Sequence, residues 1–429
     1  MQKLKQQSEE LEENVLENRL KDLRPKQRLA IMQCFQGARR KSAKGMKYNP
    51  EWLLECMIMR MKSPRLYEHV RREGILLLPS RSCLKVYMRK YKSGFGFNSM
   101  VLAGIAEKTK SMDEFKRHGG LIIDEMKLSE CLSVGIAGNV EGFVDLGAFT
   151  PDSEKHIPCD HGMVILFQPL TGSWRQILGV FASRGNVKAA LLSRIVVEAV
   201  LLTEKAGLKV DFITSDGASW NRSMWRRFGI SGSSTSIKSS VPHPVEEGRR
   251  LFFISDFPHL MKCVRNGFIK APYKTPDGAV YMEHIKGAYD EDKCAVTLKV
   301  MPKITASHVN PNNFEKMKVN LAFHLFSAEV LRGLFFYKNE VSRRWGNPAP
   351  TQAFVHRMVK LIEAMTARIP SQGLKIDSPQ ETNIKEFLEY LNKWETSLEP
   401  SKIGFISGST AEGLRGTLHA TLGLLRYAS

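Results

Sequence analysis

Between residues 119 and 230 the hydrophobic residues come in short runs, and turn-forming residues separate several of these runs. Short apolar runs bounded by turn residues predict β-strands. A longer run from Val187 to Ala206 has apolar residues at helical spacing, so it predicts an α-helix, which Gly207 ends. The strands are expected at Gly120–Asp124, Cys131–Ile136, Gly142–Leu146, Met163–Phe167, Gln176–Phe181 and Lys209–Ser215.

Two of these predicted strands deliver an aspartate at their end, in Leu121-Ile-Ile-Asp124 and in Ile213-Thr-Ser-Asp216. Several antiparallel strands, then a helix, then a strand ending in Asp is the order of an RNase H-like α/β fold. An ionised carboxylate at the end of a buried strand needs a partner. Two such carboxylates in one sheet can hold divalent cations, which take oxygen ligands and leave room for phosphate. Asp124 and Asp216 are therefore candidate catalytic and metal-binding residues.

Residues 45–95 show a different pattern, that of three short helices. Asn49-Pro50, Ser63-Pro64 and Pro79-Ser80 are typical helix starts. On the third predicted helix four basic residues recur at spacings of 4, 4 and 3 and share one face: Arg81, Lys85, Arg89 and Lys92. A last helix with a cationic face predicts a helix-turn-helix DNA-binding domain. A small helical bundle with a solvated basic face is the alternative.

The net charge supports a polyanionic partner. The chain carries a formal charge of +19, and from Lys21 to Lys92 there are 19 Lys and Arg against 5 Asp and Glu. The sequence given contains neither a lipidation motif nor a run of eighteen apolar residues, so nucleic acid is favoured over a membrane surface. Seven cysteines without a Cys-x-x-Cys pair indicate reduced thiols of a nuclear or cytosolic protein. A zinc site at His156, Cys159 and His161 lacks a second ligand pair.

The other segments complete the predicted organisation. Residues 1–24 form a charged helix ended by Pro25, whose drifting apolar repeat leaves a coiled-coil contact between copies open. After the RNase H-like domain at 96–230, the Ser- and Gly-rich residues 231–250 are expected to be a flexible linker. Residues 251–398 are mostly helical, and 399–429 begin a C-terminal segment. Helices are expected at Pro258–Gly267, Asn313–Leu331, Thr351–Arg368 and Glu381–Trp394.

Several short motifs, taken in order, point to one family. The chain resembles the P-element transposases and the related THAP-domain-associated transposase-like proteins over nearly its full length. The matching segments include Asn49-Pro-Glu-Trp52, Ile123-Asp-Glu-Met-Lys127, Glu141-Gly-Phe-Val-Asp-Leu-Gly147, Ser215-Asp-Gly-Ala-Ser-Trp-Asn221, Ser255-Asp-Phe-Pro-His-Leu-Met-Lys262 and Thr410-Ala-Glu-Gly-Leu-Arg-Gly-Thr-Leu418.

The resemblance implies an RNase H-like catalytic domain with three acids, interrupted by a helical insertion that binds GTP. By position, Asp124 and Asp216 match the first two acids, which would hold Mg²⁺. The resemblance also implies nucleotide contacts at Lys303, Val319 and Ser327. The sequence given contains no P-loop motif, so the nucleotide site would be of another type. Where the family has a guanine-reading Asp, this chain has Glu363, which is one methylene longer and would displace the purine.

Two departures from the family bear on activity. No zinc-binding THAP module precedes the helix-turn-helix, and the third acid is expected in a Gln-Asp-x-x-Glu motif after the tail helix, a motif that the sequence given does not contain. We therefore expect a truncated or degenerate copy: a nuclear protein that binds transposon-end DNA, with incomplete Mg²⁺-dependent strand cleavage and transfer. The alternative is a domesticated, catalytically inactive DNA-binding or repressor protein. An RNase H-type nuclease is less favoured, since it would not need the insertion.

Overall fold

The computed structural model describes residues 20–38, 45–89, 94–134, 140–296, 298–367 and 369–427. The chain divides into two compact units, Met1–Ser93 and Gly94–Ser429. The predicted N-terminal helix lies almost wholly outside the described residues, and residues 20–24 form turns. Pro25 does not end a helix here but begins one, α2 (Pro25–Ala38). Proline is well tolerated at the first helical position, where its missing N–H would have no helical partner.

The described residues of the first unit form three further helices, which begin at the predicted caps: α3 (Pro50–Lys62), α4 (Pro64–Arg72) and α5 (Arg81–Arg89). The Asn49 side chain accepts a hydrogen bond from the Glu51 N–H at 2.8 Å, and Ser63 accepts one from Leu66 at 3.3 Å. The small core consists of Trp52, Leu53, Cys56, Tyr67, Leu78 and Leu84. The presence and starts of these helices therefore agree with the sequence pattern.

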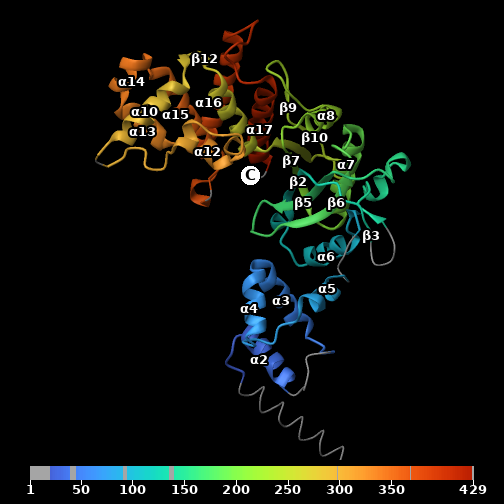
Figure 1. Cartoon of the computed structure of the whole chain (residues 1–429). Helices are drawn as coiled ribbons and strands as arrows, with labels where there is room; N and C mark the ends of the chain where they lie inside the picture. Colours follow the sequence, from blue (N-terminus) through green and yellow to red (C-terminus); the bar gives the residue numbers. More distant parts are fainter. Residues whose placement is uncertain are drawn as a thin grey trace, which may run out of the picture. The chain divides into compact units, whose positions relative to one another are not determined.

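The second unit is built on one central sheet with the strand order β1-β6-β5-β2-β7-β11-β10 (Figure 1). Its principal strands are β2 (His118–Lys127), β5 (His161–Pro169), β6 (Gln176–Ser183), β7 (Lys209–Ser215) and β11 (Arg250–Ser255); short β1 (Gly96–Phe97) and β10 (Ser240–Pro242) lie at its edges. β5 is antiparallel to β2 and β6, whereas β7 is parallel to β2 and β11. This is the arrangement expected for an RNase H-like sheet.

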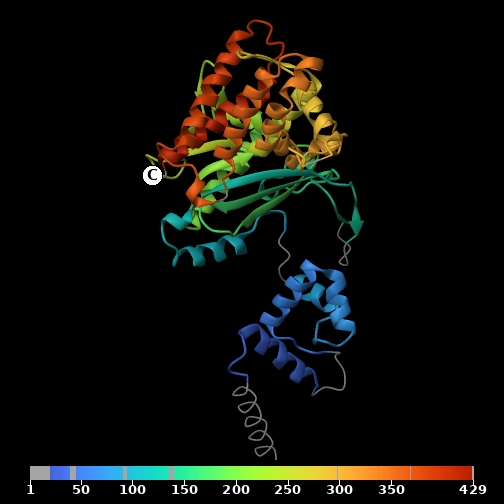
Figure 2. The ribbon, with the colours of Figure 1, turned by 90° about the vertical axis from the view of Figure 1, so that its left-hand side faces the viewer.

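Helices cover both faces of this sheet, as consecutive residues of β11 show. Phe253 packs against Trp225 and Phe228, with ring centroids 6.1 and 5.2 Å apart, on the side of α7 (Ala189–Lys205) and α8 (Ser219–Arg227). Phe252 faces the other way and packs on Tyr427 of α17 (Gly408–Tyr427), at 6.3 Å. Figure 2 shows the mainly helical part of the unit on one side of the sheet and α6 (Ser99–Thr109) on the other.

Three sequence predictions need correction in this region. The predicted strand Gly142–Leu146 forms only isolated bridges, and Cys131–Ile136 contains a described strand only at β3 (Ser133–Val134), paired with β4 (Val140–Glu141). Residues 231–250 are not a free linker: β8 (Ser231–Gly232) pairs with β9 (Ile237–Lys238), and β10 extends the central sheet. The physical reason is that this segment is hydrogen-bonded to the central sheet: the Ser239 carbonyl accepts a hydrogen bond from the Phe253 N–H of β11 at 2.8 Å.

The insertion begins after β11, later than the predicted residue 251. Its helices are α9 (Phe257–Lys270), α10 (Met282–Cys294), α11 (Ala306–Val309), α12 (Val319–Leu325), α13 (Ala328–Phe336), α14 (Lys338–Trp345), α15 (Ala349–Met365) and α16 (Pro379–Ser397), with a hairpin of β12 (Tyr273–Thr275) and β13 (Gly278–Val280). They share one large core with Ala411, Leu414 and Leu418 of α17.

One predicted helix of the insertion, Asn313–Leu331, is divided into α12 and α13 by a break at Phe326 and Ser327. The overlapping segment Val319–Phe336 has the length and apolar composition of a membrane span. Leu325, Phe326, Val330 and Leu334 of this segment are buried in the core of the insertion, which accounts for their apolar character.

Candidate active site and nucleotide site

The two predicted catalytic residues come from neighbouring strands at the same edge of the sheet. Ile122 of β2 lies opposite Thr214 of β7, and Ile254 of β11 lies opposite Thr214 on the other side. Asp124, Asp216 and Asp256 each lie two residues after one of these paired residues, Ile122, Thr214 and Ile254 respectively. Because side chains alternate between the faces of a strand and neighbouring strands lie about 4.8 Å apart, these carboxylates form a row on one face.

Asp216 is held in place by the start of α8. Its Oδ1 accepts a hydrogen bond from the Ala218 N–H at 3.0 Å and another from Asn221 Nδ2 at 2.7 Å. Asn221 is only 4 % exposed, and its Oδ1 is buried without a hydrogen-bond partner. Fixed donors of this kind orient a carboxylate. Asp124, in contrast, is exposed to solvent.

Glu125 lies beside the row but points to the opposite face of the strand from Asp124. Its Oε2 accepts a hydrogen bond from Asn186 Nδ2 at 2.8 Å, whereas its Oε1 is buried without a partner. Burial raises the pKa of the Glu125 carboxyl above its ordinary range; the negative charges of Asp216 and Asp124 add to this, and the Asn186 hydrogen bond opposes it. The half-buried position of Glu125 fits a supporting role beside the aspartates.

Asp256 is the residue of this row that sequence reasoning missed. Its backbone N–H donates to the Ser215 carbonyl at 2.9 Å, which places it directly beside Asp216. Burial raises the pKa of its carboxyl, with a further contribution from Asp124, while His259 and Lys262 of α9 act in the opposite direction. A signal was present in the sequence, because Ile254-Ser-Asp256 ends its strand just as Thr214-Ser-Asp216 does.

The chemistry of these side chains fits a hard divalent cation. Asp124 and Asp216 would supply its carboxylate ligands, and two further oxygens near the row, on Glu125 and Asn221, are buried without partners. Among the described residues, however, no group of three His, Cys, Asp or Glu side chains is arranged to hold a metal ion. The described part of the chain therefore presents two aligned ligands and no complete cage.

The residues predicted to contact a nucleotide are partly brought together. Lys303 Nζ lies 3.1 Å from Glu329 Oε1, in the first turn of α13, and Ser327 precedes that turn with its Oγ buried and unpartnered. Val319 is the first residue of α12. Glu363 is exposed on α15 and makes no side-chain hydrogen bond or ion pair with the described residues. Lys303 and Ser327 fit a phosphate at a helix start, provided that the phosphate replaces Glu329 as the partner of Lys303.

In the first unit, the structure places two of the predicted DNA-binding residues. Arg81 and Lys85 are exposed on α5, four residues apart and so on one face of the helix. Arg89 is the last residue of α5, and Lys92 lies outside the described residues.

Comparisons with known proteins agree with this architecture. Residues 93–229 match the model of the TNP-like RNase H N-terminal domain, and residues 258–376 match that of the TNP-like GTP-binding insertion domain. The chain is 25 % identical to a human DNA transposase, THAP9, over 295 residues, which are 67 % of this chain and 32 % of that protein. It is 26 % identical to the P transposase of Drosophila melanogaster over 284 residues, 65 % of this chain and 34 % of that protein.

The chain thus spans about a third of the length of these curated relatives. Among solved structures, the Drosophila P element transposase strand transfer complex matches with a TM-score of 0.75 at 20 % identity, covering 97 % of this chain and 86 % of that one. At this level of identity the match shows a shared fold. Asp124 and Asp216 both lie within the matched RNase H segment. The matched insertion segment contains Lys303, Val319, Ser327 and Glu363.

Proposed function

Because the chain belongs to the P-element transposase-like family, we propose that it is a DNA-binding protein of DNA transposition whose RNase H-like unit acts on the phosphodiester backbone. The observation that carries this proposal is that Asp124 on β2 and Asp216 directly after the parallel strand β7 lie at the same end of the sheet. A nuclear location follows from a DNA partner.

In this proposal the residues around the row have separate roles. Asp124 and Asp216 would hold Mg²⁺, which supplies activation of a water or a 3′ hydroxyl and neutralises charge on the phosphate. Asn221 and the Ala218 N–H hold the Asp216 carboxylate in a fixed direction. Asn186 holds Glu125, and so supports the strand that carries Asp124.

The first unit would supply most of the DNA affinity through the cationic face of α5. Neutralising phosphates with Arg and Lys releases counterions, so binding weakens steeply with salt. Replacing Arg81, Lys85 and Arg89 by Ala should flatten the slope of log affinity against log salt by about two to three units. Fluorescence anisotropy with labelled duplex DNA measures this slope. An unchanged slope would place the duplex site elsewhere.

The insertion would bind a purine nucleotide, with Lys303 facing phosphate and Glu363 facing the base. The family match supports a GTP-binding type of domain. Calorimetry with GTP and ATP tests this assignment, and Lys303→Ala should weaken binding of either nucleotide. Equal affinity of Lys303→Ala and the unchanged chain would remove Lys303 from the site.

A second candidate function is DNA binding without catalysis, as in a domesticated repressor. It is favoured by the exposed cations Arg81 and Lys85 of α5, which can bind phosphate without a metal ion. Incubation of the chain with supercoiled DNA and Mg²⁺ separates the two candidates. Nicking or strand joining that Asp216→Asn abolishes supports the catalytic role, whereas DNA binding without either reaction supports the repressor.

A further inference from the structure

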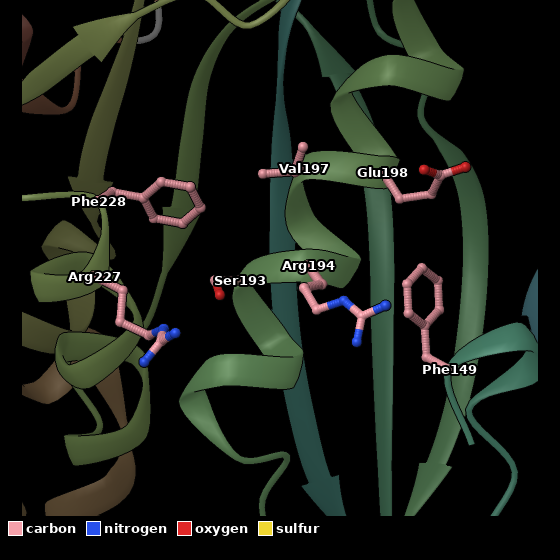
Figure 3. Close-up of a pocket in the computed structure, with 7 residues that line it drawn as sticks. All are labelled: Phe149, Ser193, Arg194, Val197, Glu198, Arg227 and Phe228. Carbon is pink, nitrogen blue, oxygen red and sulfur yellow. The ribbon is translucent and has the colours of Figure 1, made fainter. Parts of the chain in front are cut away.

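We propose that a groove on the outer side of α7 and α8 binds a single DNA strand. The inference rests on the proposed function, since it assumes that the protein works on DNA. Figure 3 shows the groove, a cavity of about 640 Å³. It is lined by Phe149, Ser193, Arg194, Val197, Glu198, Arg227 and Phe228, and it lies wholly within the second unit.

Two arginines of the groove have no hydrogen-bond or ion-pair partner among the described residues. Arg194 and Arg227 are exposed, and neither makes a side-chain hydrogen bond or an ion pair with the described residues. Arg194 lies beside the ring of Phe149, with its guanidinium carbon 6.0 Å from the ring centroid, and Figure 3 shows Arg227 next to Phe228 across the groove. Each arginine thus stands near an aromatic ring, as in grooves that follow a nucleic-acid backbone.

A second cavity adjoins this groove and reaches Asn186. It has a volume of about 330 Å³, shares Arg194 with the groove, and is also lined by Arg184, Asn186 and Lys188. Asn186 is the residue that donates to Glu125, next to Asp124. Arg184 pairs with Glu130 at 2.5 Å and with Asp160 at 4.0 Å, and Lys188 pairs with Glu154 at 3.9 Å. Exposed pairs of this kind contribute little, so phosphates can replace these partners.

The size and the walls of the groove favour a single strand over a duplex. Cavities of about 300–1,000 Å³ accept groups of small-molecule size, such as one or two nucleotides, and not the width of a double helix. Single-strand sites combine a cationic groove with aromatic rings on which bases stack. Phe149 and Phe228 are held by neighbouring rings, Phe97 at 6.5 Å and Phe253 at 5.2 Å, so they are rigid walls.

One acid, Glu198, lies in the groove, and its replacement should change the affinity for a single strand in the opposite direction from replacement of the arginines. It is half-buried and makes no ion pair with the described residues. A carboxylate here repels phosphate, so Glu198→Gln should tighten binding of a single strand, while removal of the arginines weakens it. A purely structural role for these residues predicts no such opposition.

The experiment measures binding of the full chain to a labelled single-stranded oligonucleotide across a series of salt concentrations. Arg194→Ala with Arg227→Ala should make the slope of log affinity against log salt shallower by about 1.4, at about 0.7 per phosphate contact on a single strand. Arg194→Lys with Arg227→Lys should keep most of the slope. The matched control is Lys205→Ala with Lys393→Ala, which also removes two exposed cations, from the far end of α7 and from α16; its slope should equal that of the unchanged chain.

Three results would overturn the proposal. These are an unchanged slope in the arginine variant, a loss in the arginine variant no larger than in the lysine control, and a larger loss for duplex than for single-stranded DNA. Failure of the proposed function is distinguishable from these. If the unchanged chain binds no DNA, the proposed function fails; if binding depends on α5 and not on Arg194 and Arg227, only the groove assignment fails.

Discussion

Arg249 provides the sharpest test of how the sheet beneath the site is held. Its side chain is 7 % exposed and lies at the end of the sheet opposite to the aspartates, between β7 and α7. It contacts both oxygens of Glu204 at 3.0 and 3.1 Å, Asp211 at 3.1 Å, and Glu246 at 3.2 Å. Glu204 and Asp211 are themselves 5 % and 1 % exposed. Two buried carboxylates thus depend on one guanidinium.

Arg249→Met removes this cation and leaves both carboxylates buried. Their remaining ionisable contacts are histidines, His243 at 3.3 Å from Glu204 and His118 at 2.8 Å from Asp211. Breaking a buried ion pair from one side costs about 3–5 kcal/mol, a large share of the roughly 5–15 kcal/mol by which proteins are stable. We therefore expect the free energy of unfolding of the second unit to fall by about 3–5 kcal/mol.

Urea unfolding followed by tryptophan fluorescence measures this loss in the full chain. Of its six tryptophans only Trp52 belongs to the first unit, so the signal reports mainly the second. The control is Arg344→Met, because Arg344 is 63 % exposed and lies 3.4 Å from Glu291. That change should cost less than about 1 kcal/mol. A loss of similar size in both variants would refute the role of burial.

A compensating variant separates lost packing from stranded charge. Adding Glu204→Gln and Asp211→Asn to Arg249→Met removes the uncompensated charges, so it should recover much of the lost stability. If the triple variant is no more stable than Arg249→Met alone, the loss comes from packing, and the reasoning from charge is wrong.

The same network predicts how stability depends on pH. Burial acts to raise the pKa of the Glu204 carboxyl, but hydrogen bonds from His243 and the Val210 N–H and the charge of Arg249 outweigh it, so the pKa is lowered. A carboxyl group whose pKa is lowered in the folded state stabilises the fold at pH values above its unfolded-state pKa of about 4.3. This stabilisation is lost as the pH falls below that value toward the folded-state pKa. The unfolding free energy should therefore drop in that acidic range, and it should drop less in the triple variant.

Three further predictions concern the row of aspartates, the insertion and strand β2. Asp256→Asn should raise Tm by about 2 °C, because burial and Asp124 disfavour its ionised form; a fall in the thermal scan would show that the charge is stabilised instead. Glu363→Asp should tighten GTP relative to ATP by calorimetry, an unchanged ratio arguing against a base-reading role. Gly119→Ala should cost about 2 kcal/mol in urea unfolding, since its Cβ would lie 2.4 Å from the Gln168 carbonyl oxygen; Gly104→Ala on α6, with nothing within 4 Å, should not destabilise.

The central strands, and the placing of Asp124 and Asp216 at the same end of the sheet, could be predicted because their signals are local. A run such as Leu121–Ile123 is apolar and ends in a carboxylate, and the parallel pairing of β2 and β7 brings the two ends together. The caps at Asn49 and Ser63 are equally local, since each side chain bonds a backbone N–H two or three residues ahead. Local chemistry of this kind is readable from one sequence.

The segments that could not be predicted depend on distant partners. The serines around residue 239 have the composition of a linker, but Ser239 Oγ bonds His419 Nδ1 at 2.8 Å, 180 residues away, and β10 pairs with β11. Likewise, α12 and α13 share one apolar pattern, and the break at Ser327 follows from packing in the core of the insertion. Tertiary contacts decided these elements, so periodicity alone gave the wrong boundaries.

The same contacts explain how the sheet tolerates a long insertion next to its aspartates. The chain leaves β11 at Asp256 to enter α9, and it returns in α17, where Thr417 Oγ1 accepts a hydrogen bond from the Ser255 N–H at 2.9 Å. The two ends of the insertion therefore meet at the residue before Asp256. Because the closure cost of a loop grows only slowly with length, an insertion whose ends are already close adds little strain to the sheet. Its entry point, however, fixes Asp256 between the end of β11 and the first turn of α9. The pairing of β11 with β7, in which the Asp256 N–H donates to the Ser215 carbonyl, then places this third carboxylate beside Asp216.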